Sequence, residues 1–272
     1  MMKIAEWITK STALLQSSGI DSARLDSLML LEYVLGKSRV TILTHLDEVI
    51  PNKALQLLDE SLDRRQKREP IAYIIGKKEF YGREFIMSNA VLIPRPESEA
   101  IIDEVVALNL EEGSRIADVG TGSGILAITL AIELPKSRVD AYDINAEALE
   151  IAKKNSQLLQ ANVHFLQGDL LESAQQTYNV IVANLPYVSD SQYVSPETAF
   201  EPKLALYAED DGLLLIKKLI TQIRKHKLLH SKGYIVLESE PRQHNSVRSY
   251  SKKYGLRLIN TQGFVQKFQF ED

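Results

Sequence analysis

The chain has 272 residues, a formal net charge of −4 and no cysteine. Its 44% apolar and 25% charged residues are enough for one large or two modest packed domains, and they exclude extensive disorder. The lack of cysteine excludes disulfides, thiol nucleophiles and zinc–thiolate sites, and the acidic balance argues against bare nucleic acid as the main partner. Because neither a signal peptide nor an apolar run of membrane-spanning length is found, a cytoplasmic protein is expected.

Residues 1 to about 70 are predicted to be helical. Apolar residues recur there at helical spacing, Gly19 and Gly36 mark helix ends, and a further helix is expected from about 52 to 67, after Pro51. Charges nearly cancel in this region, so it does not form a basic nucleic-acid arm. A small helical domain is expected, and such a bundle beside a catalytic domain can recognise a protein substrate.

The pattern changes between residues 74 and 99. Aromatic residues on both sides of Gly82 predict a β-hairpin over 78–87. In the following segment, Leu92 to Glu99, two prolines bracket Arg95 and make the backbone stiff and extended. Pro96 suits the first turn of the next helix. We expect a linker over 73–95 between a helical domain at 1–72 and a catalytic domain at 96–272.

Strands and helices alternate after Gly113, which predicts an α/β fold with a mostly parallel, doubly wound sheet and an antiparallel edge. The expected strands are 115–119, 138–143, 163–167, 178–183, 234–238, 256–260 and 265–270. The expected helices are 125–133, 146–159, 213–230 and 246–254.

Acidic and glycine residues follow the first three of these strands. The loop Asp118-Val119-Gly120-Thr121-Gly122-Ser123-Gly124 lets a ligand approach the backbone closely, and it differs in spacing from the dinucleotide fingerprint G-x-G-x-x-G. Asp118 is suited to a cationic group such as the amino-acid part of S-adenosylmethionine, Asp143 to ribose hydroxyls, and Asp169 to an adenine amine. The predicted cofactor-binding residues are Asp118, Gly120, Thr121, Gly122, Ser123, Gly124, Asp143, Asp169, Leu170 and Asn184.

The tetrapeptide Asn184-Leu185-Pro186-Tyr187 follows the buried strand 178–183. The Asn184 side chain and the Leu185 backbone carbonyl are two acceptors beside an aromatic ring, an arrangement that can hold a planar NH2 group. These four residues are the predicted catalytic residues. They are also predicted to bind the substrate, together with Arg95 and Glu201.

These motifs resemble those of S-adenosylmethionine-dependent methyltransferases and, over the whole chain, those of the HemK/PrmC family of release-factor glutamine methyltransferases. The residues that carry the resemblance are Pro70–Gly76, Glu79–Gly82, Leu92–Glu99, Asp118–Gly124, Asn184–Tyr187 and Phe200-Glu201-Pro202 with Ala205-Leu206. The proline-arginine-proline-glutamate stretch is the most specific of them.

The resemblance implies a seven-stranded Rossmann-like domain with strand order 3-2-1-4-5-7-6, preceded by a small all-α domain that contacts the release factor. It also implies S-adenosylmethionine as the cofactor and methylation of the glutamine amide nitrogen in the Gly-Gly-Gln motif. Two departures from the family pattern are present. Leu185 replaces the usual first proline of Asn-Pro-Pro-Tyr, and the glycine expected between Glu238 and Gln243 is missing, which we interpret as a local change near the edge of the site.

Asn-Leu-Pro-Tyr is also the form found in ribosomal RNA adenine dimethyltransferases, so an rRNA or DNA adenine N6-methyltransferase is the main alternative. A non-catalytic binding module and a nicotinamide oxidoreductase are further alternatives, which the intact acidic, glycine and Asn184 motifs disfavour. We expect a monomer that binds neither membrane nor nucleic acid directly. No metal is expected, because the histidines lack metal-ligand spacing: they are His45, His164, His226, His230 and His244.

Overall fold

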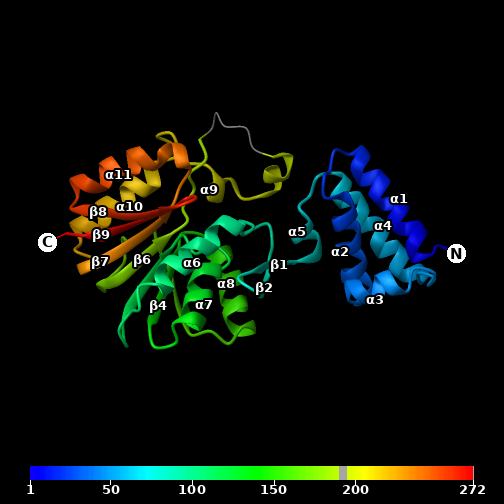
Figure 1. Ribbon diagram of the computed structural model, residues 1–272, viewed down its shortest axis with the longest axis horizontal. Coiled ribbons are helices and arrows are strands. Elements are labelled where there is room, and N and C mark those ends of the chain that lie inside the picture. The colour runs from blue at the N-terminus through cyan, green and yellow to red at the C-terminus, as the bar shows by residue number, and fades with distance from the viewer. Residues whose placement is uncertain (190–194, 272) are drawn as a thin grey trace. The chain divides into compact units, whose positions relative to one another are not determined.

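The computed structural model describes residues 1–189 and 195–271, which separate into two compact units. The helical unit consists of Met1–Lys77 together with Ser195–Phe200, and the sheet unit contains the rest of the described chain (Figure 1). The functional division of the chain into a recognition domain, a linker and a catalytic domain stays a prediction. No helix among the described residues combines the length and apolarity needed to cross a membrane.

The helical unit confirms the prediction of a helical N-terminal region. Gly36 ends the second helix in a left-handed conformation with φ of 62°, which glycine adopts without a steric penalty. Trp7 is among the buried residues that pack the helices together. The elements are α1 (Ile4–Ser17), α2 (Ala23–Leu35), α3 (Arg39–Thr44), α4 (Asn52–Gln66), α5 (Ile71–Ile75) and the 3-10 helix η2 (Pro196–Phe200).

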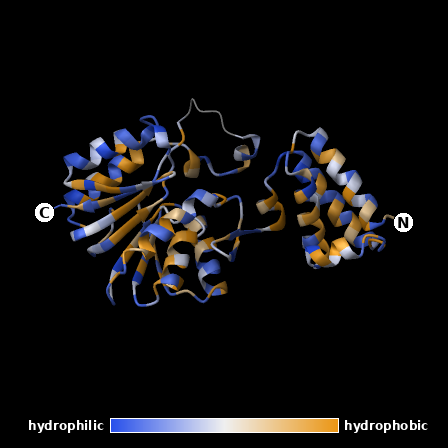
Figure 2. Cartoon of the chain, viewed as in Figure 1, coloured by the Kyte–Doolittle hydropathy of each residue, from blue (hydrophilic) through white to orange (hydrophobic). Residues whose placement is uncertain are grey.

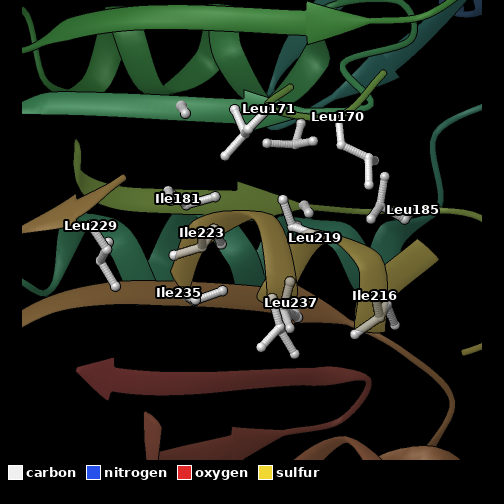
Figure 3. Packing of buried hydrophobic residues seen from close by; sticks show 14 of the residues in the cluster. Leu170, Leu171, Ile181, Leu185, Ile216, Leu219, Ile223, Leu229, Ile235 and Leu237 are labelled. Carbon is white, nitrogen blue, oxygen red and sulfur yellow. The ribbon is translucent and has the colours of Figure 1, made fainter. Parts of the chain in front are cut away.

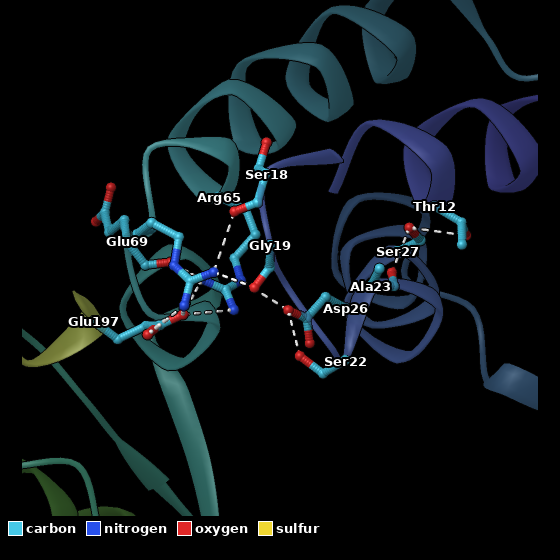
Figure 4. Close-up of polar contacts among 11 residues, drawn as sticks. Thr12, Ser18, Gly19, Ser22, Ala23, Asp26, Ser27, Arg65, Glu69 and Glu197 are labelled. Carbon is cyan, nitrogen blue, oxygen red and sulfur yellow. Dashed lines mark hydrogen bonds and ion pairs between the residues drawn. The ribbon is translucent and has the colours of Figure 1, made fainter. Parts of the chain in front are cut away.

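A buried group of charges joins η2 to α2 and α4 within the helical unit (Figure 4). Arg65 Nε donates to Asp26 Oδ2 at 2.7 Å, and Arg65 Nη1 donates to Glu197 Oε1 at 3.2 Å. Arg68 Nη2 donates to Glu197 Oε2 at 3.0 Å. The side chains of Arg65 and Asp26 are only 6% and 3% exposed. Because buried charges are costly without partners, these pairs hold residues 195–200 to the helices.

The predicted hairpin is formed by β1 (Lys77–Phe80) and β2 (Arg83–Ile86). Tyr81 and Gly82 have φ values of 49° and 69°, as a tight two-residue turn requires. The Asn155 side chain accepts from the Ile86 backbone N–H at 2.6 Å and donates to its carbonyl at 3.1 Å. These two bonds fix the hairpin to helix α8 (Ala146–Leu158).

The seven-stranded sheet has the order β5-β4-β3-β6-β7-β9-β8, which is the predicted order 3-2-1-4-5-7-6. Strand β9 runs antiparallel to both of its neighbours, β7 and β8, and the other neighbouring pairs in the sheet are parallel. The fold prediction is therefore confirmed. The strands are β3 (Arg115–Val119), β4 (Arg138–Asp143), β5 (Val163–Gln167), β6 (Tyr178–Ala183), β7 (Leu229–Glu238), β8 (Leu256–Gln262) and β9 (Val265–Phe270).

Helices cover both faces of the sheet (Figure 1). One face carries α6 (Glu99–Val106), α7 (Ile125–Glu133) and α8, and the other carries α10 (Leu214–Lys225) and α11 (His244–Lys253). Figure 3 shows the core on the second face, where Ile181 and Leu237 of the sheet face Leu219 of α10. In Figure 2 the central strands are largely hydrophobic and the outer helices carry hydrophilic residues. Three short helices lie in the connections of the sheet unit: η1 (Pro96–Ser98), α9 (Lys203–Leu206) and η3 (Pro241–Gln243).

The expected helix over 213–230 is wrong at its C-terminal end. α10 ends at Lys225, and Lys227 adopts a left-handed φ of 53°. The next apolar pair, Leu228 and Leu229, is buried against the sheet, where the Leu228 carbonyl accepts from Tyr178 N at 2.8 Å. Leu229 therefore begins strand β7, ahead of the expected start at 234, and the apolar residues at this point resemble a helical face in the sequence alone.

Candidate active site

The glycine loop between β3 and α7 forms one wall of the candidate site. Gly120, Gly122 and Gly124 have φ values of 75°, 55° and 83°, a region that favours glycine. The backbone N–H groups of Gly120 and Thr121 both donate to the Tyr142 carbonyl at 2.9 Å. The loop is thereby fixed to strand β4. A Cβ atom on Gly122 would stand in open space, so the backbone is bare at this point.

Asp118 lies beneath this loop, fully buried. Its Oδ2 atom accepts from Thr121 Oγ1 at 2.6 Å and from the Ala127 backbone N–H at 3.1 Å. Its Oδ1 atom has no partner among the described residues. Burial raises the pKa of Asp118 to about 7, against the opposing effect of its two hydrogen bonds. In this structure Asp118 stabilises the turn from the loop into α7.

Asp143 ends strand β4 beside the same loop. Its Oδ2 atom accepts from the Gly122 backbone N–H at 2.8 Å, and its Oδ1 atom accepts from Asn145 N at 2.9 Å. Burial raises the pKa of Asp143, although these backbone donors oppose the shift. The carboxylate is thus held in one orientation at the edge of the site.

Asp169 and Leu170 follow β5. Asp169 forms an ion pair with Lys218 of α10. Leu170 adopts a left-handed φ of 55° and is 8% exposed. The backbone turn therefore directs both residues to the end of the sheet where Asp143 lies.

These loops enclose one cavity within the sheet unit. Its walls combine apolar side chains with a few polar groups, as ligand sites usually do. The lining residues are Ala90, Val91, Leu92, Pro94, Gly120, Thr121, Gly122, Ser123, Ile125, Leu126, Asp143, Ile144, Asn145, Ala148, Gly168, Asp169, Leu170, Asn184, Leu185, Pro186, Pro202, Leu204, Ala205 and Leu215. Most of the predicted cofactor residues and three of the four predicted catalytic residues are thus brought together.

Five predicted site residues do not line this cavity in the described part of the chain: Asp118, Gly124, Tyr187, Arg95 and Glu201. Two of them contact each other. Arg95 Nη2 donates to Glu201 Oε1 at 2.7 Å, and Glu201 Oε2 accepts from the Ile93 backbone N–H at 3.2 Å. Glu201 therefore fixes the segment before α6 rather than facing the cavity.

Asn184-Leu185-Pro186-Tyr187, called the acceptor motif below, begins where β6 ends. Asn184 and Pro186 are partly exposed at the cavity, whereas Leu185 is 3% exposed and packs in the core. The Tyr187 hydroxyl donates to Glu238 Oε1 at 3.0 Å, and burial raises the pKa of Tyr187. The tyrosine ring is therefore anchored at the end of strand β7.

Three residues that had no predicted role hold this motif. Ser98 Oγ accepts from Asn184 Nδ2 at 2.9 Å and donates to Glu238 Oε2 at 2.6 Å. Gln243 Nε2 donates to the Tyr187 carbonyl at 2.9 Å. Glu238 and Gln243 had been assigned to the edge of the site. The position of these two residues beside the acceptor motif could have been predicted, because β7 ends next to β6 in the predicted strand order.

Two family models match the chain: the PrmC N-terminal domain over residues 6–76 and the methyltransferase small domain over residues 98–201. The release factor glutamine methyltransferase of Neisseria gonorrhoeae is 38% identical over 237 residues, covering 85% of this chain and 86% of that protein. The chain belongs to the release factor glutamine methyltransferase family. The Escherichia coli K12 member is 36% identical over 251 residues, covering 91% of this chain and 89% of that protein.

Solved structures agree with the fold of this release factor glutamine methyltransferase family member. A methyltransferase from Pyrococcus furiosus has a TM-score of 0.53 at 16% identity, over 72% of this chain and 92% of that chain. The 16S rRNA N2 G1207 methyltransferase of T. thermophilus, solved with AdoMet and guanosine, has a TM-score of 0.53 at 14% identity, over 72% of this chain and 50% of that chain. At such low identity the likeness supports the architecture alone.

Proposed function

We propose that this protein transfers a methyl group from S-adenosylmethionine to the side-chain amide nitrogen of the glutamine in the Gly-Gly-Gln motif of peptide chain release factors. The observation that carries the proposal is the shared cavity. Asn184 and Leu185 of the acceptor motif line the same space as Gly122 and Asp143 of the cofactor loops. The names of the relatives at 38% and 36% identity support the same substrate.

The residues that line the cavity fit S-adenosylmethionine. Gly122 leaves its backbone accessible, since an added Cβ would meet no atom within 4 Å. Asp143 has a carboxylate suited to ribose hydroxyls, and the apolar Ile144 and Leu170 side chains suit a flat base. When bound, the cofactor supplies an electrophilic methyl group on a sulfonium.

The acceptor motif can position an amide nitrogen, which is a weak nucleophile. An amide nitrogen lone pair is delocalised into the carbonyl group, so the nitrogen must be both positioned and stabilised as it gains positive charge. In the proposed mechanism Asn184 Oδ1 and the Leu185 carbonyl accept the two amide hydrogens. As the nitrogen–methyl bond forms, the bond from that methyl group to sulfur breaks and leaves a neutral thioether. The nitrogen becomes acidic and loses one proton to solvent. No general base is needed before the attack.

The remaining predictions belong to the same proposal. The helical unit contacts the release factor, and Tyr187 forms a wall of the substrate site near Arg95 and Glu201. The enzyme acts as a monomer in the cytoplasm, without membrane or direct nucleic-acid partners. The alternative of a nucleic-acid adenine methyltransferase is not favoured by the names of the relatives.

The deciding experiment compares three acceptors with labelled S-adenosylmethionine: a release factor, the same factor with Gly-Gly-Ala in place of Gly-Gly-Gln, and ribosomal RNA. We expect label only on the first, located on the glutamine amide by mass spectrometry. Label on adenine, or on the Gly-Gly-Ala factor, would contradict the proposal.

A variant tests the role of the motif itself. Asn184→Ala removes one of the two amide acceptors, so methyl transfer should fall about 100-fold while cofactor affinity by calorimetry stays within about twofold. Equal losses of transfer and cofactor affinity would count against the assigned role of Asn184.

A further inference from the structure

The Asn184 side chain belongs to a row of hydrogen-bonded side chains that also includes Glu238 of strand β7. Asn184 Nδ2 lies 2.9 Å from Ser98 Oγ, which lies 2.6 Å from Glu238 Oε2. The other carboxylate oxygen, Glu238 Oε1, accepts from the Tyr187 hydroxyl at 3.0 Å. Ser98 is fully buried and Glu238 is 1% exposed, so water does not compete for these bonds.

The fold places these groups together through strand register. β6 and β7 are parallel neighbours, and Ala183 pairs with Leu237. Asn184, the residue after β6, and Glu238, the last residue of β7, therefore lie side by side at this end of the sheet. Ser98 reaches both from the turn before α6, whose position is set by the stiff proline segment.

The number of available protons decides which group donates in each of these hydrogen bonds. Burial raises the pKa of Glu238, but its carboxylate accepts from two hydroxyl donors, Ser98 and Tyr187, which oppose this shift and favour the ionised form. In that form the carboxylate only accepts, and a serine hydroxyl has one proton. Ser98 therefore donates its proton to Glu238 and has only acceptor capacity left for Asn184. Asn184 must present its NH2 group to Ser98, which leaves Oδ1 on the opposite side of the carboxamide. With the amide reversed, two oxygen atoms would face each other without a proton between them, at a cost of roughly 1–3 kcal/mol.

We propose that Ser98 and Glu238 are positioning residues that fix the Asn184 carboxamide with Oδ1 free to accept from the glutamine NH2 group. The inference rests on the proposed function, in which that oxygen is one of the two amide acceptors. Without this restraint the Asn184 amide rotates and presents NH2 to the substrate NH2 group, a contact between two donors. Ser98 and Glu238 act through Asn184 and have no assigned contact with the substrate.

The first test reads the hydrogen bond in the free protein. In protein labelled with 15N-asparagine, the Asn184 side-chain NH2 group should show one deshielded proton that exchanges slowly with solvent. Ser98→Ala should return that proton to an ordinary position, and Ser98→Thr, which keeps the hydroxyl, should preserve it. The control is Ser251→Ala, since Ser251 is equally buried in α11 and its hydroxyl has no partner among the described residues.

The second test measures single-turnover methyl transfer to a release factor. Ser98→Ala should reduce the rate about 10-fold or more, with cofactor Kd and KM for the release factor within about twofold. Ser98→Thr should recover most of the rate. In the Asn184→Ala background, Ser98→Ala should cause no further loss, because residues that act as one unit are not additive.

Glu238→Gln provides an independent variant if Ser98→Ala does not fold. Its carboxamide replaces one acceptor with a donor, so one of the two hydroxyl bonds is lost and the rate should fall. A wild-type rate in Ser98→Ala, or equal losses from Ser98→Ala with and without Asn184, would overturn the inference. An unchanged Asn184 NH2 resonance in Ser98→Ala would overturn it as well.

The two proposals fail separately. A wild-type protein that transfers no methyl group to the release factor contradicts the proposed function, while the resonance experiment still decides how Asn184 is oriented.

Discussion

A Cβ atom on Gly120 would stand only 2.8 Å from Leu185 Cδ2. Gly120 is the first glycine of the cofactor loop, and Leu185 is the residue at which this chain departs from Asn-Pro-Pro-Tyr. The leucine side chain is 3% exposed and belongs to the core of the sheet unit. The departure therefore brings a core side chain of the acceptor motif into contact with the cofactor loop.

Gly120→Ala should destabilise the protein by more than backbone strain alone. The control is Gly82→Ala, because Gly82 has a similar φ of 69° but no atom within 4 Å of an added Cβ. We expect a loss of about 1 kcal/mol for Gly82→Ala and about 1–3 kcal/mol more for Gly120→Ala, measured by denaturant unfolding. Equal losses would show that Leu185 gives way without cost.

Gly122→Ala should separate cofactor binding from stability. An added methyl group would meet no protein atom within 4 Å, so its cost in unfolding free energy should match that of Gly82→Ala, about 1 kcal/mol. The methyl group would project from the bare backbone of the loop. S-adenosylmethionine affinity measured by calorimetry should then fall about 10-fold or more, whereas Gly82→Ala should leave it unchanged. Wild-type affinity in Gly122→Ala would remove this loop from the binding site.

Asp118 should make stability fall as pH rises. Burial raises the pKa of Asp118 to about 7, from an ordinary value of 3.8. Between pH 3.8 and about 7 the folded protein keeps a proton on Asp118 that the unfolded chain has lost. The stability that protonated Asp118 contributes is therefore fully present below pH 3.8 and is lost as pH rises through about 7.

The comparison with Asp118→Asn isolates this effect, because burial also raises the pKa of Asp143 and of Glu238. The unfolding free energy of wild type minus that of Asp118→Asn should decrease by an amount on the order of 2–4 kcal/mol between about pH 4 and pH 8, without cofactor. A difference that stays constant with pH would contradict the raised pKa of Asp118.

Arg65→Ala should destabilise the helical unit strongly. It leaves Asp26 buried without its cationic partner and removes one cation from Glu197, and breaking a buried ion pair costs about 3–5 kcal/mol. The matched control on the same helix is Arg64→Ala, since Arg64 is 46% exposed and pairs with Glu69. That control should cost less than about 1 kcal/mol in denaturant unfolding. Similar costs for both variants would show that the Arg65 group is not a stabilising contact.

The strand and helix alternation and the place of the cofactor cavity were predictable because they follow from local patterns, whereas the strand order was implied by the resemblance to the family. Apolar runs that end in Asp118, Asp143 or Asn184 place those residues at one edge of a parallel sheet, whatever the rest of the chain does. The Leu228-Leu229 pair was assigned to a helix because its burial comes from pairing with Tyr178, about fifty residues earlier in the chain. Contacts between distant residues leave no local pattern.

The same reason explains why Ser98 and Glu238 were missed. Their bond joins residues 140 positions apart, and it depends on the register of β6 against β7. Ser98 looked like an ordinary helix start, and Glu238 looked like a strand end. Only the assembled sheet shows that both surround the Asn184 side chain.

Residues 195–200 belong to the helical unit, whereas the described residues that precede them, up to Ser189, and those that follow, from Glu201, belong to the sheet unit. A fragment that starts at residue 78 would keep Glu197 but discard Arg65 and Arg68, the cations that neutralise it. The two halves of the protein therefore cannot be separated by a single cut. Evolutionary exchange of the helical half for another recognition module would also require a matching change in this short internal segment.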